Sequence, residues 1–401
     1  MQKNIVFIGG GIETYPGIEI CQKRNYKVII VDGNNNCYCK SIADHFIHAS
    51  TYDYKSIVKK LKKKFSHKLK IDAILSLGVD VPYSVAYVAK KIGCASIPLK
   101  TAKICSDKLK FKKKIIENKI LTSKYLIIKK EEDLKKINFK MTVLKPVDSR
   151  GARGVFVLSK KKISYYFKES FKYTNKNYIL AEEFINGPQL STESIIINYK
   201  ATTFSVSDRN YKDTINLRPF MIENGSDMPS NYKKKFQKKI DKIISKLSRV
   251  LNIRNGVIKG DLVIKNNNIY IIEAAPRLSG GFFCSHMLPI SNGIDIIDIY
   301  LDLLLFGSTN KSKLIEKHSK YVSQRFVFAK EGKIKKITMP NELEKKCDLL
   351  IIYKKENEFQ PKIKAHPDRS AMIICSDTSK KNLTLKTKNL IRKIKFKVNN
   401  N

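Results

Sequence analysis

The sequence lacks long apolar runs, closely spaced cysteine pairs and a balanced share of acidic residues. No segment approaches the roughly 18 consecutive apolar residues that a membrane-spanning helix needs, so we expect no membrane partner. Residues 1–9 lead directly into a strand-like apolar run without a signal-peptide pattern, which predicts a cytoplasmic protein. Of the eight cysteines, only Cys37 and Cys39 lie close together, and without a second pair they do not predict a zinc site.

The shortage of acidic residues leaves the chain strongly basic. It has 36 Asp and Glu against 78 Lys and Arg, a formal net charge of +42. A nucleic-acid-binding protein would concentrate such charge on one face. Here the lysines are spread from Lys3 to Lys397, and Ile and Asn are also used heavily. Because the codons of these three residues are rich in A and T, a base-biased genome explains the composition, and we expect no specific nucleic-acid partner.

The N-terminal segment alternates apolar runs with helix-like stretches. Residues 5–8 form a run typical of a buried parallel strand, three glycines follow, and a second run ends at Asp32. This order predicts a doubly wound α/β domain over residues 1–104. An NAD(P)-dependent oxidoreductase is a remote alternative, because the third glycine of a G-x-G-x-x-G fingerprint would fall at Thr14.

Two apolar runs near residue 265 are joined by asparagines and bracketed by carboxylates. Asparagine tolerates the left-handed backbone of a tight hairpin. If Asn266 to Asn268 form the loop, Lys265 faces Ile269, and counting outward places Asp261 opposite Glu273. Two carboxylates this close need a neutralising cation, and oxygen ligands of this kind suit Mg²⁺. The alternative is a surface hairpin whose acidic ends only face water.

Cations and glycines flank a second loop, at residues 145–155. A lysine at a strand end and backbone N–H groups freed by glycine can approach the same oxyanion. No Gly-Lys-Ser/Thr opens a helix here, so the segment is not a P-loop. A mobile basic hairpin loop is the alternative. Near the asparagine hairpin, Arg277 and the glycines at 280–281 add to the features that suggest phosphate chemistry.

Four motifs in this order resemble the ATP-grasp superfamily: Lys108, Lys145 with its glycine loop, the Glu182-Glu183-Phe184-Ile185 segment, and the acidic hairpin with Arg277. The resemblance covers about residues 1–310, and the tail is similar to the small C-terminal domain of the biotin-carboxylase-like and amino-acid-ligase branches. It implies an α/β and α+β fold. A doubly wound pre-ATP-grasp domain (1–104) would precede an ATP-grasp domain (105–310) with a mobile lid (about 120–185) and a small C-terminal α/β domain (311–401).

The resemblance also implies roles for individual residues. ATP would be bound through its phosphates, its adenine and its ribose by Lys108, Lys145, Gly151, Gly154, Glu182, Glu183, Ile185 and Gln189. Asp261 and Glu273 would hold Mg²⁺ or Mn²⁺, and Arg277 would stabilise the transferring phosphoryl group as the catalytic residue. Ala275 stands where the family usually has Asn, so one metal ligand must come from water or a neighbour.

A substrate side is implied less specifically. Arg209 or Arg218 could clamp a carboxylate, or could form surface pairs with nearby acids such as Glu223. Glu193 shares a strand face with Gln189 and could face the acceptor substrate or be an exposed strand carboxylate.

The resemblance implies an ATP-dependent carboxylate–amine ligase that works through an acyl phosphate and releases ADP and phosphate. Its partners would be an amino acid or similar small carboxylate and an amine, and a homodimer is one expected assembly. A carboxyphosphate-forming carboxylase of the purine or biotin type is the alternative within the superfamily. The six histidines lie in no pattern with a serine or cysteine nucleophile that would indicate another chemistry.

Overall fold

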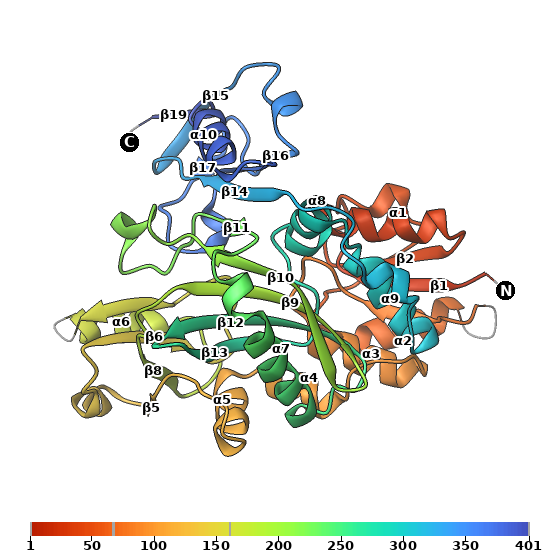
Figure 1. Ribbon diagram of the computed structural model, residues 1–401, viewed down its shortest axis with the longest axis horizontal. Helices are drawn as coiled ribbons and strands as arrows, with labels where there is room; N and C mark the ends of the chain where they lie inside the picture. The colour runs from red at the N-terminus through yellow and green to blue at the C-terminus, as the bar shows by residue number, and fades with distance from the viewer. Residues whose placement is uncertain (1, 66–68, 160–161, 400–401) are drawn as a thin grey trace.

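The computed structural model describes residues 2–65, 69–159 and 162–399 and arranges them around four β-sheets. The N-terminal unit (red and orange in Figure 1) lies beside a large sheet (green), a smaller lid sheet (yellow) extends from it, and the C-terminal segment (blue) lies above. Within these ranges, no helix combines the length and the apolar character that crossing a bilayer requires.

The N-terminal unit is a parallel α/β sheet in the order β3-β2-β1-β4. The predicted strand runs at 5–8 and 28–31 are confirmed, and their side chains are buried because helices cover the sheet. Asp32 accepts the backbone N–H of Gly10 at 2.7 Å, so this carboxylate fixes the glycine turn. The elements are β1 (Asn4–Ile8), α1 (Tyr15–Lys23), β2 (Lys27–Asp32), β3 (His45–His48), α2 (Tyr54–Phe65), β4 (Ala73–Leu75) and α3 (Pro82–Ile92).

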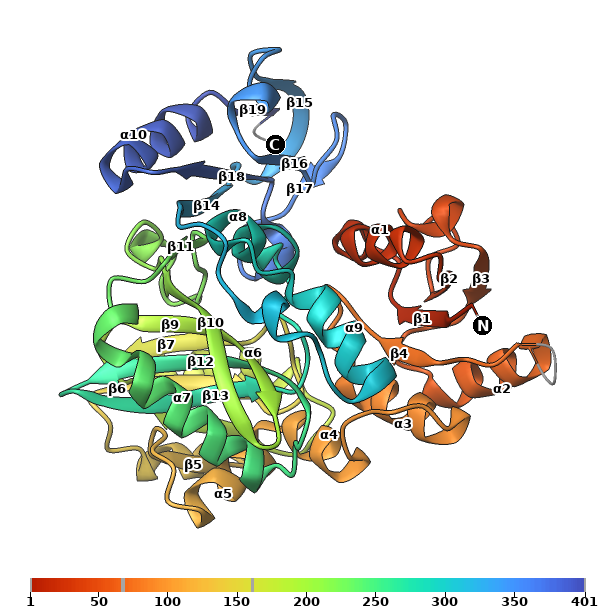
Figure 2. The same ribbon diagram turned by 45° about the vertical axis from the view of Figure 1, so that its right-hand side comes forward.

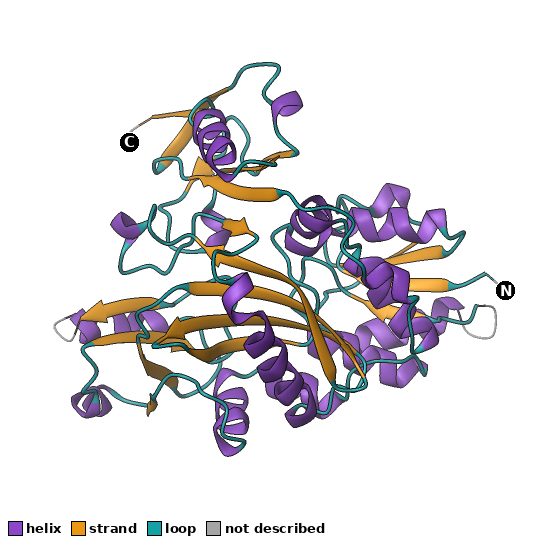
Figure 3. Cartoon of the chain, in the orientation of Figure 1, coloured by secondary structure: helices purple, strands orange, loops and turns teal. Residues whose placement is uncertain are grey.

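The large sheet has the order β13-β12-β9-β10-β11-β14-β18-β16, so strands of the C-terminal segment continue it through β11. Figure 3 shows helix α7 lying across its strands, and the apolar face of α7 shares a buried core with them. The elements are β9 (Gln189–Ile197), β10 (Lys200–Arg209), β11 (Ser226–Met228), α7 (Lys233–Val250), β12 (Gly256–Lys265), β13 (Asn268–Ala275), β14 (Tyr321–Val327), β16 (Leu349–Ile352) and β18 (Ala371–Asp377).

The asparagine hairpin joins β12 to β13 with a register that differs from the one predicted. Its loop has only two residues, Asn266 and Asn267, with φ of 48° and 59°, as expected for a type I′ turn. Lys265 therefore pairs with Asn268 and not with Ile269, so the predicted three-residue loop is wrong. A β-bulge then adds one residue to β13, and Asp261 pairs with Glu273 after all.

The lid sheet is antiparallel, in the order β5-β8-β6-β7, and has its own apolar core. Two helices connect it to the N-terminal unit. Asp107 caps the second by accepting two backbone N–H groups at 3.0 Å, which fixes Lys108 in its first turn. The elements are α4 (Leu99–Cys105), α5 (Lys108–Glu117), β5 (Tyr125–Ile128), β6 (Met141–Pro146), β7 (Phe156–Ser159), α6 (Ile163–Phe171) and β8 (Ile179–Glu183).

Helix α9 (Ile296–Phe306) lies between the N-terminal sheet and the large sheet in Figure 2, and residues of all three share one buried core. The predicted basic helix near residues 379–394 is confirmed as α10, but a further strand follows it. The remaining elements are α8 (Leu288–Asn292), β15 (Gly332–Thr338), β17 (Phe359–Gln360), α10 (Lys380–Ile391), β19 (Lys395–Asn399) and the short helices η1 (Ile12–Thr14), η2 (Lys40–Ile42), η3 (Glu131–Lys136), η5 (Ile215–Leu217), η6 (Phe283–Met287), η7 (Lys311–Leu314), η8 (Glu344–Lys346) and η9 (His366–Asp368).

Candidate active site

A cavity of about 800 Å³ opens where the N-terminal unit, the lid sheet, the large sheet and the C-terminal segment meet. Its lining includes ten residues to which the family resemblance gives a role in nucleotide binding, metal binding or catalysis: Lys108, Lys145, Gly151, Glu182, Glu183, Ile185, Gln189, Asp261, Glu273 and Arg277. Gly154 lies behind this wall. A β-carbon on Gly154 would come within 2.8 Å of Tyr173 and 2.9 Å of Pro146, so glycine is required there for packing.

The lid end of the cavity contains a buried cluster of charges around Glu182, on β8. Its oxygens lie 2.8 Å from Lys145 Nζ and 3.2 Å from Lys112 Nζ, and Ser123 Oγ donates to it at 2.7 Å. Burial alone would raise the pKa of Glu182, but the two lysines outweigh that effect and hold it below its usual range. Glu182 therefore orients Lys145, and both of its oxygens are already engaged by neighbouring side chains.

The hinge between lid and large sheet brings the three remaining nucleotide candidates to the cavity. Glu183 lies 3.7 Å from Lys265 Nζ, Ile185 is 5% exposed, and Gln189 begins β9. The backbone of Gly187 packs so closely on β12 that a β-carbon there would lie 2.0 Å from the carbonyl oxygen of Ile264. The hinge backbone is thus fixed against the large sheet.

The two proposed metal carboxylates face the cavity from opposite strands of the hairpin. Asp261 accepts from Ser191 Oγ at 3.1 Å, lies 3.3 Å from Arg209 Nη1 and also pairs with Lys259. Glu273 is more open, because its side chain is 40% exposed and its nearest cation, Lys108 Nζ, is 3.9 Å away.

These donors fit a hard divalent cation unequally. Magnesium prefers one or two carboxylates together with phosphate oxygens and water. Glu273 has free acceptor capacity for it, whereas Asp261 would have to exchange one of its cationic partners for the metal. Ala275 lies across the strand pair from Lys259, so no side-chain oxygen replaces the missing asparagine at that position. Within residues 2–65, 69–159 and 162–399, no cluster of three or more His, Cys, Asp or Glu forms a ready-made metal site.

Arg277 follows β13 and pairs with a residue that the sequence interpretation missed. Its Nε lies 2.6 Å from Asp80, in the loop after β4, and the other oxygen of Asp80 lies 2.9 Å from Arg150 Nε. Burial alone would raise the pKa of Asp80, but these two arginines hold it well below its usual range. Nothing in the sequence near Asp80 indicates this contact, because both partners are distant along the chain.

The glycine loop between β6 and β7 is fixed by contacts outside the lid sheet. Its backbone is left-handed at Gly151, with φ of 65°, and Lys108 Nζ donates to the carbonyl of Ser149 at 2.7 Å. The backbone N–H of His366, in the C-terminal segment, donates to the carbonyl of Gly151 at 3.0 Å. The loop therefore lies over the cavity between the N-terminal unit and the C-terminal segment.

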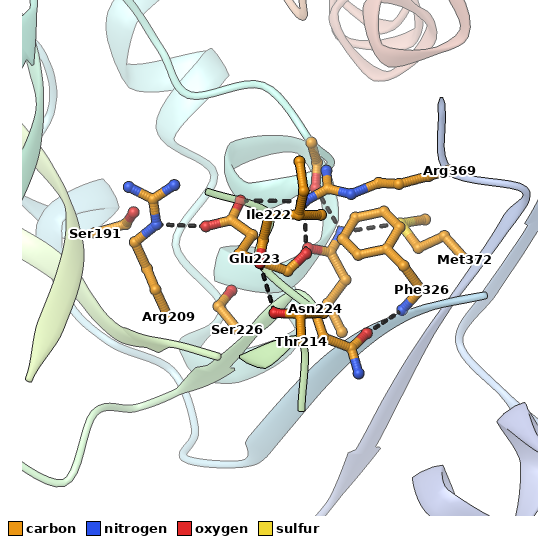
Figure 4. A network of polar contacts seen from close by, with 12 residues as sticks. Ser191, Arg209, Thr214, Ile222, Glu223, Asn224, Ser226, Phe326, Arg369 and Met372 are labelled. Carbon is orange, nitrogen blue, oxygen red and sulfur yellow. Dashed lines mark hydrogen bonds and ion pairs between the residues drawn. The ribbon is translucent and has the colours of Figure 1, made fainter. Parts of the chain in front are cut away.

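The cavity wall formed by the end of β10, the loop before β11 and the C-terminal segment contains a second ion-pair network (Figure 4). Glu223 pairs with Arg209 and, at 3.5 Å, with Arg369, whose guanidinium lies 3.7 Å from the centre of the Phe326 ring. The predicted pairing of Arg209 with Glu223 is present, but it is buried in the cavity wall instead of lying on the surface. Arg218 instead lies over the ring of Phe184, at 5.2 Å.

Glu193 lies in the middle of β9 and is fully buried, so the interpretation as an exposed strand carboxylate is wrong. It accepts the backbone N–H of Ser279 at 3.0 Å and so holds the turn that follows Arg277. Burial raises its pKa to about 7, although the hydrogen bonds from Ser279 and the charges of Arg277 and Lys259 act in the opposite direction.

A family model relates this chain to ATP-grasp domains, and two sequence relatives are a ligase and a synthase. Residues 105–281 match the ATP-grasp domain family. The tyramine–L-glutamate ligase of Methanocaldococcus jannaschii is 32% identical over 253 residues, which cover 60% of this chain and 68% of that protein. An N5-carboxyaminoimidazole ribonucleotide synthase of Staphylococcus epidermidis is 22% identical over 279 residues, covering 68% and 69%.

Solved structures agree in fold over nearly the whole chain. The L-amino acid ligase from Bacillus licheniformis superposes with a TM-score of 0.83 at 18% identity, covering 100% of this chain and 99% of that one. Phosphoribosylglycinamide synthetase from Anaerococcus prevotii superposes with a TM-score of 0.74 at 18% identity, covering 100% of both chains.

Proposed function

The chain belongs to the ATP-grasp superfamily and is an ATP- and Mg²⁺-dependent ligase that forms C–N bonds, and we propose that it joins a small carboxylic acid to an amine. In this proposal, the terminal phosphoryl group of ATP is transferred to the substrate carboxylate. The amine then attacks the carbonyl carbon of the acyl phosphate, loses a proton, and forms an amide, and phosphate and ADP leave. The main support is that Lys108, Glu273 and Arg277 face one cavity.

The nucleotide is proposed to occupy the lid end of this cavity. Lys145, held by Glu182, and Lys108, held by Ser149, present their ammonium groups to the phosphates. The hinge at Glu183 and Ile185 offers polar backbone beside a buried apolar side chain, which suits the edge and face of adenine. Gln189 would donate a hydrogen bond to the ribose without adding charge.

Catalysis in this proposal depends on positioning and charge neutralisation. Phosphoryl transfer needs little proton transfer from the protein, because the negative charge on the moving group is what must be stabilised. Arg277 is fixed by Asp80 and by its own donation to the carbonyl of Leu278 at 2.9 Å, so its orientation is set before reaction. Magnesium held by Glu273, with Asp261 as second carboxylate, would add positive charge at the phosphates.

The glycine loop is proposed to keep water away from the acyl phosphate. It contacts the N-terminal unit through Arg150 and the C-terminal segment through Gly151, so it covers the cavity from both sides. An acyl phosphate hydrolyses if water reaches it before the amine, and a covered cavity favours the amine.

Carboxyphosphate chemistry on bicarbonate is the second candidate, supported by the resemblance to carboxyaminoimidazole ribonucleotide synthases. One observation favours an organic carboxylate. The cavity wall around Glu223 is also lined by the rings of Tyr211, Phe326 and Tyr353, which offer apolar contact that bicarbonate cannot use.

The proposal is tested by measuring ADP release with Mg·ATP across pools of amino acids and other small carboxylates, each with and without added amines. We expect ADP release that depends on one carboxylate, disappears when EDTA removes the metal, and is lost in Glu273→Ala and Lys145→Ala. The matched controls are Glu132→Ala and Lys140→Ala, on exposed parts of the lid. Bicarbonate-dependent ADP release with no response to organic acids would favour the second candidate, and turnover unaffected by both site variants would overturn the site.

A further inference from the structure

We propose that Asp80 is a positioning residue that couples closure of the glycine loop to the orientation of Arg277. The expected effect on catalysis rests on the proposed function, because it assumes that Arg277 acts on the phosphoryl group. The coupling itself rests on one carboxylate shared between two arginines, and it can be measured without turnover.

The geometry assigns one oxygen of Asp80 to each arginine. Oδ1 lies 2.6 Å from Arg277 Nε and Oδ2 lies 2.9 Å from Arg150 Nε. All three side chains are partly buried, with exposed fractions of 29% for Asp80, 18% for Arg277 and 29% for Arg150, so solvent screens the pairs only in part. Each ion pair is also a charge-assisted hydrogen bond, which is stronger and more directional than a neutral one.

The three partners belong to three different parts of the chain. Asp80 is in the loop after β4, Arg277 follows the hairpin strand β13, and Arg150 is in the glycine loop of the lid sheet. The Asp80 loop is itself fixed, because Gly78 adopts φ of 71° and packs against Glu13, where a β-carbon would lie only 2.8 Å away. The Asp80 carboxylate, held rigidly on the N-terminal unit, thus links the glycine loop to Arg277.

Sharing the carboxylate has two physical consequences. First, Asp80 offsets part of the repulsion between the two guanidinium groups that it contacts. Second, when Arg150 occupies Oδ2, the carboxylate can hold Arg277 only through Oδ1. Arg277 then has Nε on Asp80 and Nη1 on the Leu278 carbonyl, and among the described residues its Nη2 has no protein hydrogen-bond partner. That nitrogen is left for an incoming phosphate.

Other contacts of the loop fit the same role. The Arg150 guanidinium lies over the Tyr52 ring of the N-terminal unit at 5.6 Å, next to its pair with Asp80. Arg153, in the same loop, is exposed, and among the described residues its guanidinium contacts only the carbonyl of Arg150, at 3.5 Å. The loop therefore carries one arginine that docks on the N-terminal unit and one that does not, which provides a matched control.

The experiment is a double-mutant cycle of Asp80→Asn and Arg150→Gln, with Asp80→Asn and Arg153→Gln as the control cycle. The first readout is hydrogen exchange of the loop amides at residues 151–154 in the presence of Mg·ADP, which needs no substrate. The second is kcat and the KM for ATP with the carboxylate found in the ADP-release screen.

Either Asp80→Asn or Arg150→Gln should speed loop exchange by about 10-fold or more, because each removes the charge-assisted hydrogen bond that docks Arg150 on Asp80. The pair should be non-additive, with the double variant within about 3-fold of the worse single variant, whereas the control pair should be additive. We expect kcat to fall by about 10- to 100-fold in Asp80→Asn, with a smaller change in the KM for ATP, because orientation in the transition state is what is lost.

Three results would overturn the coupling: unchanged loop exchange in Asp80→Asn, additive effects of Asp80→Asn and Arg150→Gln, or faster exchange spread evenly over the N-terminal unit, which would indicate a structural role only. If Asp80→Asn does not fold, exchange in Arg150→Gln against Arg153→Gln decides the question, since equal loop protection in these two contradicts docking. If no carboxylate supports ADP release, the proposed function fails while the exchange cycle still accepts or rejects the coupling.

Discussion

Two glutamates face the same cavity from different sheets, and their surroundings differ. The Glu182 side chain is 3% exposed and lies 2.8 Å and 3.2 Å from two lysines, whereas Glu273 is 40% exposed with its nearest lysine 3.9 Å away. A buried carboxylate with two cations is a fixed part of the wall, since removing the carboxylate leaves both lysines without a counter-ion. An open carboxylate with one distant cation keeps its lone pairs for a ligand. The difference separates the residue that orients a lysine from the residue proposed to hold a metal.

The lysines around Glu182 illustrate the same contrast. Burial lowers the pKa of Lys112 to about 8, while Glu182 acts to raise it. Lys112 is 1% exposed and donates to Thr122 and Ser123 at 2.9 Å, so it supports Glu182 from behind and does not reach the cavity lining. Lys145, on the other side of Glu182, does line the cavity.

The largest effect should come from removing the buried charge. Glu182→Gln leaves Lys145 and Lys112 without a counter-ion, and we expect a loss of about 3–5 kcal/mol in the free energy of unfolding. Urea unfolding followed by circular dichroism measures it. The exposed Glu132→Gln, in the short helix η3 that joins two strands of the same sheet, should change stability by less than about 0.5 kcal/mol. A loss below about 1 kcal/mol for Glu182→Gln would contradict the view of a fixed wall.

Glu273→Gln should give the opposite result. Its distant, half-exposed pair with Lys108 contributes little to folding, so we expect a stability change below about 1 kcal/mol. Turnover should nevertheless fall by at least about 100-fold, because a neutral amide is a poor magnesium ligand beside phosphates. ADP release and urea unfolding of the same preparation test both halves. Near-normal turnover would remove Glu273 from the metal site.

Glu193, a second buried glutamate, should make the stability of the fold depend on pH. Its pKa is raised to about 7 by burial, so between about pH 4.5 and 7 the unfolded chain releases a proton that the folded chain retains. Stability contributed by this group is therefore lost as the pH rises through that range, and it stays lost above pH 7. Replacing Glu193 with Gln should remove this decline, on the order of 2 kcal/mol between pH 5 and 8. Parallel pH profiles of the unfolding free energy for wild type and Glu193→Gln would contradict this role of Glu193.

Glu223→Gln should have the smallest effect. Arg209 keeps its contact with Asp261, and the Glu223 side chain is 18% exposed against 3% for Glu182, so we expect a stability loss of about 1–2 kcal/mol, smaller than for Glu182→Gln. The KM for the carboxylate should rise while the KM for ATP changes by less than about 2-fold, because the wall around Glu223 is proposed to bind the carboxylate. Glu342→Gln, an exposed glutamate of the C-terminal segment, is the control. An equal rise in both KM values would contradict the assignment of the wall around Glu223 to the carboxylate.

The hairpin shows how a sequence pattern can reach a correct pairing through an incorrect register. Two apolar runs and the asparagines between them were enough to predict two strands and a tight loop. The bulge that restores the pairing of Asp261 with Glu273 depends on how β13 packs, and no local signal in the sequence marks it.

The cavity residues that the sequence did not reveal are mainly those whose partners lie far away along the chain. Asp80 and Arg369 line the cavity and pair with residues about 200 and 150 positions away, and neither belongs to a recognisable motif. Glu193 was misjudged for a related reason. Its place on a strand was predictable, but its burial depends on the layers that cover both faces of β9.

By itself, the sequence determined the superfamily, the order of the elements and the set of nucleotide and metal candidates, because apolar periodicity and short motifs depend on neighbours along the chain. Only the tertiary structure decided which carboxylates are buried, which remain exposed to the cavity and which arginines share one carboxylate. Those properties follow from burial and distance between segments far apart in sequence, and the energy of a charge depends on both.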